Sequence, residues 1–118
     1  MPDLGQSGAR VICCGGRDYR NGQVVWRALA ALPVGATVVH GAARGADEYV
    51  DRFAPRLGIE VERHPADWTR GRRAGPERNE RMAKLGAELC LAFPGGRGTE
   101  DMMRRAEAHG IPVKKVGW

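Results

Sequence analysis

The sequence alternates short apolar runs with longer segments in which apolar side chains recur every three or four residues, and this alternation restricts the fold more than any other feature. The strand-like runs occupy residues 9–14, 36–40, 59–64, 89–93 and 111–116. The segments between them predict helices over residues 23–32, 46–57, 76–85 and 99–109. Parallel strands need helical crossovers, so the pattern predicts an α/β fold in which helices cover a parallel, doubly wound sheet.

Three of these predicted strands lead directly into turns that contain glycine and arginine, at residues 15–18, 41–45 and 94–99. In a parallel sheet, ligands bind beyond the carboxyl ends of the strands, so we expect the three turns to meet there. Their backbone N–H groups and arginines could hold phosphate oxygens. The residues expected to contact a ligand are Gly15, Gly16, Arg17, Asp18, Gly41, Arg44, Gly45, Pro94, Gly95, Gly96, Arg97, Gly98 and Thr99.

The third turn is the richest in glycine and precedes a predicted helix. Pro94 ends the strand, and Gly95 and Gly96 permit close approach of a ligand to the backbone. Thr99 either caps the helix or donates its hydroxyl to an anionic oxygen. Because the first N–H groups of a helix lack partners, this turn is the expected phosphate site.

Charge and aromatic content narrow the class of partner. The formal net charge is +5, and arginines outnumber lysines, which favours an anionic ligand. Aromatic residues make up 6% of the chain and do not alternate with basic ones, so the sequence offers no stacking platform for single-stranded nucleic acid. A nucleotide or nucleotide-derived small molecule is therefore the expected partner, with nucleic acid as the less favoured alternative.

The length of the chain and the kinds of segment that it lacks predict its domain organisation and its location in the cell. A chain of 118 residues predicts one domain over residues 9–118, after a flexible start at residues 1–8. It contains neither a long apolar run nor a signal peptide, so we expect a cytoplasmic protein that does not enter a membrane. The cysteines, Cys13, Cys14 and Cys90, predict reduced core residues, and we expect neither a metal site nor a cofactor.

Several side chains have two interpretations. Asp18 could accept ribose hydroxyls or cap the following helix, whereas Asp47 is expected to support its own turn by capping the helix predicted at residues 46–57. Trp68, in the long loop at residues 65–76, could stack on a base or cover an edge of the core. His40 could act as an acid, although a structural, hydrogen-bonded histidine is the favoured interpretation. The alternating run at residues 59–64 predicts an edge strand.

The chain resembles the SLOG superfamily, which contains the Lonely Guy phosphoribohydrolases and the DprA proteins. The resemblance rests on five short sequence motifs that occur in the same order along the chain. The resemblance is greatest to its YspA-type, cpYpsA-related family. The motifs are residues 15–19 (GGRDY), 40–47 (HGAARGAD), 65–68 (PADW), 75–82 (GPERNERM) and 94–102 (PGGRGTEDM). The resemblance implies a Rossmann-like, three-layer domain with about five strands in the order 3-2-1-4-5 and a nucleotide site. It also makes a homodimer possible.

The resemblance also suggests an enzymatic activity, hydrolysis of the N-glycosidic bond of a nucleoside 5′-monophosphate. By that resemblance the catalytic candidates are Arg78, Glu100 and Asp101. Glu77 and Glu80 lie on the same predicted helix as Arg78 and could orient that arginine by ion pairing. The glutamate of the Lonely Guy enzymes is replaced by Met102, and one position along a helix turns a side chain by about 100°. Whether the chain is an enzyme is therefore left open, with a non-enzymatic nucleotide sensor, or a DprA-like nucleic-acid-binding module, as the alternative.

Overall fold

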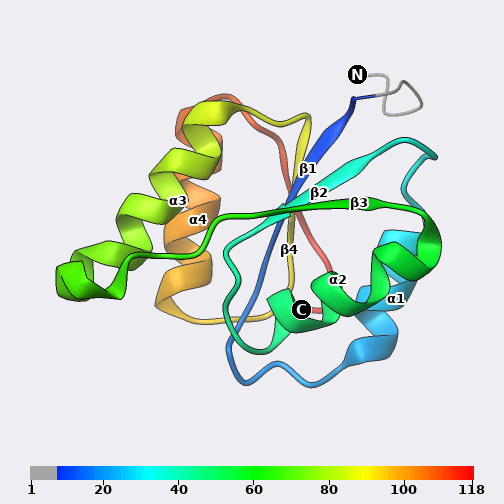
Figure 1. The fold of residues 1–118 in the computed structure, drawn as a ribbon, viewed down its shortest axis with the longest axis horizontal. Helices are drawn as coiled ribbons and strands as arrows, with labels where there is room; N and C mark the ends of the chain where they lie inside the picture. The colour runs from blue at the N-terminus through cyan, green and yellow to red at the C-terminus, as the bar shows by residue number, and fades with distance from the viewer. Residues whose placement is uncertain (1–7) are drawn as a thin grey trace.

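A computed structural model describes residues 8–118 as a five-stranded parallel sheet between two layers of helices (Figure 1). The strand order is β3-β2-β1-β4-β5, so the predicted fold class and the predicted edge position of β3 are both confirmed. The strands are β1 (Arg10–Cys14), β2 (Thr37–His40), β3 (Glu60–Arg63), β4 (Leu89–Ala92) and β5 (Val113–Lys115). The helices are α1 (Gly22–Ala30), α2 (Ala46–Phe53), α3 (Ala74–Leu85) and α4 (Arg97–Ala108), with 3₁₀ helices η1 (Pro55–Leu57) and η2 (Trp68–Arg73).

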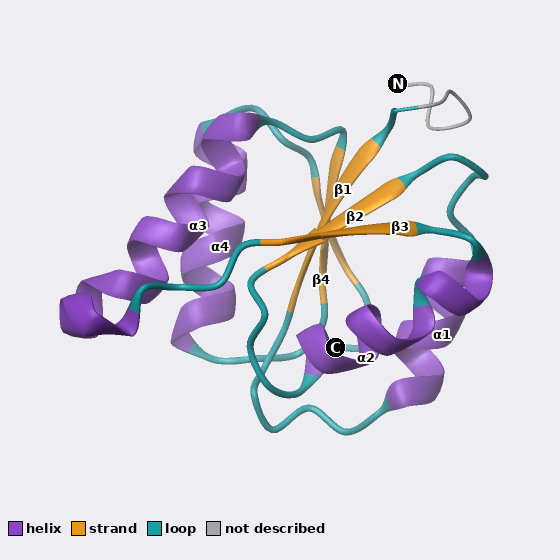
Figure 2. Cartoon of the chain, viewed as in Figure 1, coloured by secondary structure: helices purple, strands orange, loops and turns teal. Residues whose placement is uncertain are grey.

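The sheet divides the core into two halves, because successive residues of each strand point to opposite faces. Helices α1 and α2 cover one face and α3 and α4 cover the other (Figure 2). In β1, Val11 and Cys13 belong to the α1–α2 half of the core, whereas Ile12 and Cys14 belong to the α3–α4 half. The three cysteines are free and buried, and Met102 and Met103 fill the core on the α4 side.

Several helix boundaries differ from the sequence prediction. Helix α2 ends at Phe53 and η1 follows, because the ring of Pro55 cannot donate a hydrogen bond to continue the ladder. Residues 68–73 are not an extended loop but the 3₁₀ helix η2, whose backbone is interrupted at Gly71 (φ 70°) and then runs directly into α3. Helix α4 begins at Arg97, two residues before the predicted start, with Gly96 as its N-cap.

The predicted flexible start covers residues 1–8, of which residues 1–7 lie outside the described residues. Within residues 8–118, no helix combines the length and the apolar character needed to cross a membrane.

Candidate functional site

The three glycine turns are joined to one another by backbone hydrogen bonds at the carboxyl ends of β1, β2 and β4. The Gly16 N–H donates to the Pro94 carbonyl oxygen (2.9 Å), which links the first turn to the third. The Gly16 carbonyl in turn accepts from the Ala46 N–H (3.2 Å), which links the first turn to the second. The expected convergence of the turns is therefore confirmed, and Gly16 is its centre.

Three glycines, Gly15, Gly45 and Gly95, are required by this close packing. A Cβ atom on Gly15 would lie 2.5 Å from Cβ of Ala46, and one on Gly95 would lie 2.7 Å from the Gly16 nitrogen. Gly41 lies against the guanidinium of Arg78, and Gly45 has φ 78° and lies against the backbone of the first turn. Real Cβ atoms do not approach other atoms so closely, so Gly15, Gly45 and Gly95 must lack a side chain, whereas the atoms close to Gly41 belong to the end of a flexible side chain.

A cavity of about 710 Å³ opens where the turns meet, within the usual size range of small-molecule sites. Its lining includes most of the candidate residues predicted from the sequence, namely Gly15, Gly16, Arg17, Gly41, Arg78, Gly96, Arg97, Gly98, Thr99, Glu100 and Asp101. Of the other candidates, Gly45, Pro94 and Gly95 form the frame behind it, and Asp18 and Arg44 are exposed outside the lining.

The first turn of α4 forms one wall of the cavity. No side chain caps this helix, and its first intrahelical bond runs from the Glu100 N–H to the Gly96 carbonyl (3.0 Å). Thr99 is the third residue of the helix and therefore not its cap, and its buried side chain lines the cavity. A Cβ atom on Gly96 or Gly98 would meet nothing within 4 Å, so these two glycines leave open space beside uncapped N–H groups.

Arg78 is the most deeply buried cation of the site, with 9% of its surface exposed. Its Nη1 donates to the Gly41 carbonyl (2.5 Å) and its Nε to Oδ1 of Asn79 (2.8 Å). Burial lowers the pKa of Arg78 from its ordinary value, an effect that nearby Asp47 opposes. Arg78 therefore fastens α3 to the second turn from inside the cavity.

The expected ion pairs between Arg78 and the two glutamates of α3 are wrong. Glu77 pairs with Arg70 (2.9 Å), and Glu80 pairs with Arg105 and His109 on α4. Both glutamates thus point toward the surface, where they hold other cations, and Arg78 is oriented by neutral acceptors.

Asp101 lines the cavity, but its carboxylate is already bound on both oxygens. Oδ2 accepts from Asn79 (3.0 Å) and from Arg105 (2.9 Å), and Oδ1 accepts from Arg104 (2.9 Å). Burial alone would raise its pKa, but the hydrogen bond from Asn79 and the two arginines outweigh it, so the pKa of Asp101 is lowered. Asp101 therefore joins α4 to α3 as a fixed anion, a role that the sequence pattern did not indicate.

Asp47 is a buried carboxylate that lines the same cavity. Its Oδ2 accepts from the N–H groups of Gly41 and Ala43, both at 3.2 Å, so it supports its own turn as expected. The N-cap of α2 is nevertheless Gly45, so Asp47 does not cap this helix. Burial raises the pKa of Asp47, although His40 and the two N–H groups act in the opposite direction.

His40 is a structural residue, as the favoured interpretation held. It is buried, its Nδ1 accepts from the Ala42 N–H (2.9 Å), and its Nε2 lies 2.8 Å from Asp51. Because Nδ1 accepts, the ring proton lies on Nε2 and is donated to Asp51. His40 does not line the main cavity, so it is not placed to act as its acid.

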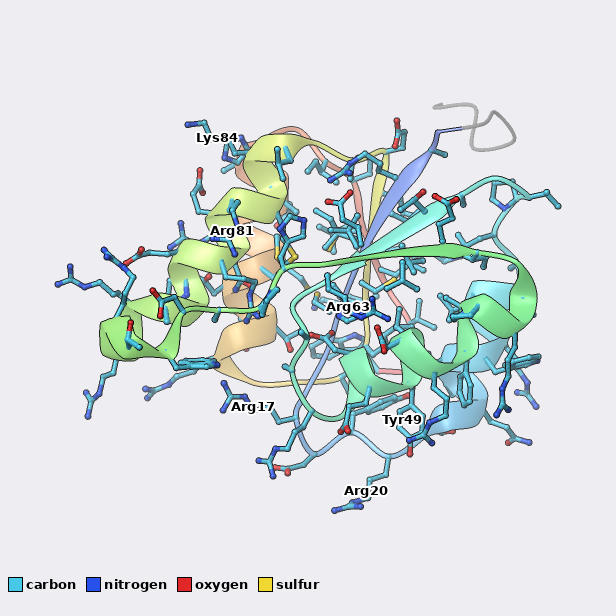
Figure 3. All side chains as sticks on the ribbon, viewed as in Figure 1. Arg17, Arg20, Tyr49, Arg63, Arg81 and Lys84 are labelled. Atoms are coloured by element: carbon cyan, nitrogen blue, oxygen red, sulfur yellow. The ribbon has the colours of Figure 1, made fainter. Side chains whose placement is uncertain are left out.

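Positive charge surrounds the entrance of the cavity. Arg17, Arg72 and Arg97 line it and form no ion pair with an acidic side chain among residues 8–118. Arg17 extends from the first turn toward the α3 side of the molecule (Figure 3), where its guanidinium carbon lies 5.1 Å from the ring centre of Trp68. The entrance therefore offers cations that are free to bind an anion.

The sequence did not predict the connecting role of Asn79. Its side chain accepts from Arg78 and donates to Asp101 and to the Gly98 carbonyl (3.3 Å), so it couples the buried arginine to the start of α4. The residue stands within the motif at 75–82, but a single amide in a helix gives no signal of its partners. Arg72 and Arg104 also line the cavity, although neither was among the predicted site residues.

The fold and the site together define a Rossmann-like α/β domain with a cavity at the carboxyl ends of its strands. A sequence model of the YspA, cpYpsA-related SLOG family matches residues 9–71, and the chain belongs to this family. The gene 61 protein of Mycobacterium phage D29 is 44% identical over 120 residues, which cover 92% of this chain and 96% of the phage protein.

Solved structures share the fold at low sequence identity. The C-terminal domain of a hydrogenase from Pyrococcus furiosus matches with a TM-score of 0.54 and 12% identity, over 98% of this chain and 96% of that one. A second structure of that domain gives a TM-score of 0.48 with 14% identity, over 97% and 95% of the two chains. The first of these similarities supports the fold alone.

Proposed function

We propose that the cavity binds a nucleotide or a nucleotide-derived ligand, with its phosphate at the first turn of α4. The observation that carries this proposal is the joining of three glycine turns into one wall of a 710 Å³ cavity that also contains an uncapped helix start. Family membership supports a nucleotide-related role for a Rossmann-like domain of this kind.

The charges of the lining support a phosphate rather than a neutral ligand. The N–H groups of residues 96–99 have no intrahelical acceptor, and the helix dipole adds positive potential at the same place. Arg97 and Arg17 lie on the same lining and can add charge-assisted hydrogen bonds. Arg78 fixes the second turn instead of competing for the phosphate, because its Nε and Nη1 already have acceptors.

N-glycosidic hydrolysis is the second candidate, and one observation favours it. The Glu100 carboxylate lines the cavity and has no hydrogen-bond partner among residues 8–118, whereas both oxygens of Asp101 are occupied. Cleavage needs a carboxylate that can stabilise the sugar cation or activate water. Release of free base should therefore be assayed with Glu100→Gln and Asp101→Asn, and hydrolysis by this site predicts that Glu100→Gln has the greater loss.

The binding proposal is tested by thermal unfolding with a panel of nucleoside monophosphates. A ligand at 100 times its dissociation constant adds about 2.7 kcal/mol to the free energy of unfolding. For a chain of this length that corresponds to a rise in Tm of about 10 °C. No shift with any nucleotide of the panel would refute the proposal.

A pair of arginine variants shows whether the ligand is held at the proposed place. Arg97→Gln removes a cation from the cavity lining, and Arg27→Gln removes the same charge from α1, outside that lining. We expect Arg97→Gln to weaken nucleotide binding by roughly 10-fold or more, since hydrogen bonds to charged groups contribute about 1.5–3 kcal/mol. Equal weakening by both variants would indicate a general charge effect and not this site.

The DprA-like use of the same loops on nucleic acid makes a different prediction. Affinity for DNA would fall steeply with salt and would not be competed by mononucleotide. Competition by a mononucleotide at constant salt therefore separates the two alternatives. A sensor that binds without hydrolysis gives the thermal shift without release of base.

A further inference from the structure

Trp68 is the one aromatic side chain among the described residues that line the cavity. It opens η2, the 3₁₀ helix between β3 and α3, and more than half of its surface (55%) is exposed. A large apolar ring that remains exposed beside a cavity contributes little to the core. Its position therefore needs an explanation other than folding.

The interpretation that Trp68 covers an edge of the core is not supported. It belongs to neither half of the core and packs against no other aromatic ring among residues 8–118. The other tryptophans are held in place, because Trp26 packs edge-on against Phe53 and Trp118 donates to the Ala92 carbonyl (2.8 Å). The recorded partner of the Trp68 ring is the Arg17 guanidinium, at 5.1 Å from its centre.

The Arg17 contact shows which way the ring faces. Arg17 belongs to the glycine turn at residues 15–18, so one face of the ring is turned toward that glycine turn, which lines the same cavity as the start of α4. The far tip of the ring lies near the start of α3, where a Cβ atom on Gly75 would be 3.7 Å from it, an ordinary van der Waals distance. A planar group that enters the cavity can therefore lie on the same face that the guanidinium now occupies.

We propose that Trp68 is the stacking platform for the aromatic base of the ligand, an inference that rests on the proposed function. The base takes the ring face from Arg17, and the released guanidinium is then available to the phosphate. Stacking is possible with every base, because every base has a π-face. The site therefore selects ligands that carry a base over plain sugar phosphates, and discriminates little among the four bases.

The experiment compares two kinds of ligand with three forms of the protein. Affinities for AMP, GMP, CMP and UMP, and for ribose 5-phosphate, are measured by calorimetry with the wild type, Trp68→Ala and Trp68→Phe. Stacking on an aromatic side chain makes a nucleotide bind about 5-fold to 150-fold more tightly than the same sugar phosphate without a base. Trp68→Ala should remove this preference without weakening ribose 5-phosphate binding, and Trp68→Phe should retain most of it.

Tryptophan fluorescence gives an independent measurement. In the double variant Trp26→Phe/Trp118→Phe, Trp68 is the remaining tryptophan, and nucleotides should quench it whereas ribose 5-phosphate should not. Trp26→Phe alone is the control for affinity, since Trp26 lies on α1 outside the cavity lining.

The outcomes separate this inference from the proposed function. If the wild type binds nucleotides and Trp68→Ala leaves the nucleotide preference intact, the platform is refuted and the binding site stands. If Trp68→Ala weakens nucleotides and ribose 5-phosphate equally, Trp68 only positions Arg17, and the platform is again refuted. If the wild type binds none of these ligands, the proposed function fails and this inference fails with it.

Discussion

Replacing Gly45 with alanine tests whether the three turns are packed as tightly as the structure shows. Gly45 is the N-cap of α2, with φ 78° and ψ −121°, a backbone conformation that residues with a Cβ atom rarely adopt. The new methyl group would lie 2.5 Å from the Arg17 carbonyl oxygen and closer still to that of Gly16. The Gly16 carbonyl cannot move away without losing its hydrogen bond from the Ala46 N–H.

The expected loss is the sum of three effects. The unfavourable backbone conformation costs about 1–3 kcal/mol, and forcing a methyl group into a packed site costs about 1–3 kcal/mol. Weakening the Gly16–Ala46 hydrogen bond costs a further 0.5–1.5 kcal/mol or so. Since these effects overlap, we expect a total of about 3–5 kcal/mol, which lowers Tm by roughly 12–20 °C at about 4 °C per kcal/mol.

Gly71→Ala is the matched control, because Gly71 has a similar backbone conformation (φ 70°, ψ −143°) but a Cβ atom there would meet nothing within 4 Å. It has only the conformational cost, about 1–3 kcal/mol, or roughly 4–12 °C. Both variants are measured by calorimetry and by urea unfolding at pH 7. Equal losses in the two variants would refute the reasoning, since the close approach of the first two turns would then contribute nothing.

Three further predictions concern the cavity and its supports. Gly96→Ala should change Tm by no more than about 4 °C, because the new Cβ atom has open space around it. It should nevertheless weaken nucleotide binding at least 10-fold in a calorimetric titration, since Gly96 lines the cavity beside the proposed phosphate position. Unchanged affinity would place the phosphate elsewhere. Arg78→Met should lower the free energy of unfolding by about 2–4 kcal/mol in urea, since it leaves the buried Gly41 carbonyl and the Asn79 amide oxygen without their donor; a loss below 1 kcal/mol would contradict this. Asp101→Asn should cost about 1–3 kcal/mol at pH 7. The folded-state pKa of Asp101 is lowered, so its contribution is complete above the unfolded value near 4 and is lost as the pH falls through the folded value. The difference between wild type and Asp101→Asn should therefore shrink at pH 3, and a constant difference would argue against a charge effect.

The sheet could be predicted from the sequence because its signals are local. The β-branched run before His40 and the alternation at residues 59–64 each fix a strand without knowledge of the rest of the chain. The boundaries of the helices could not be predicted as accurately. Helix α4 begins at Arg97 because its N-cap, Gly96, has non-helical dihedral angles (φ −105°, ψ −136°). The glycines around it give no sign in the sequence of where helical dihedral angles begin.

The candidate site was predicted in its backbone but not in its polar contacts. Strand order alone brings the turns that contain Gly16, Gly41 and Gly95 together, because they follow three adjacent parallel strands and so lie at the same end of the sheet. Which donors Asp101 would bind depends on the rotation of α4 against α3, and that rotation is set by packing around buried residues such as Met102. The residue type and its spacing do not contain this information.

The turns are joined through Gly16, Ala46 and Pro94 by main-chain atoms alone. A main-chain connection makes no demand on the side chains that project from the same turns, so the residues at positions 17, 44 and 97 can change without loss of the frame. Exchanging these three side chains is therefore a route to altered ligand preference in which the scaffold needs no redesign.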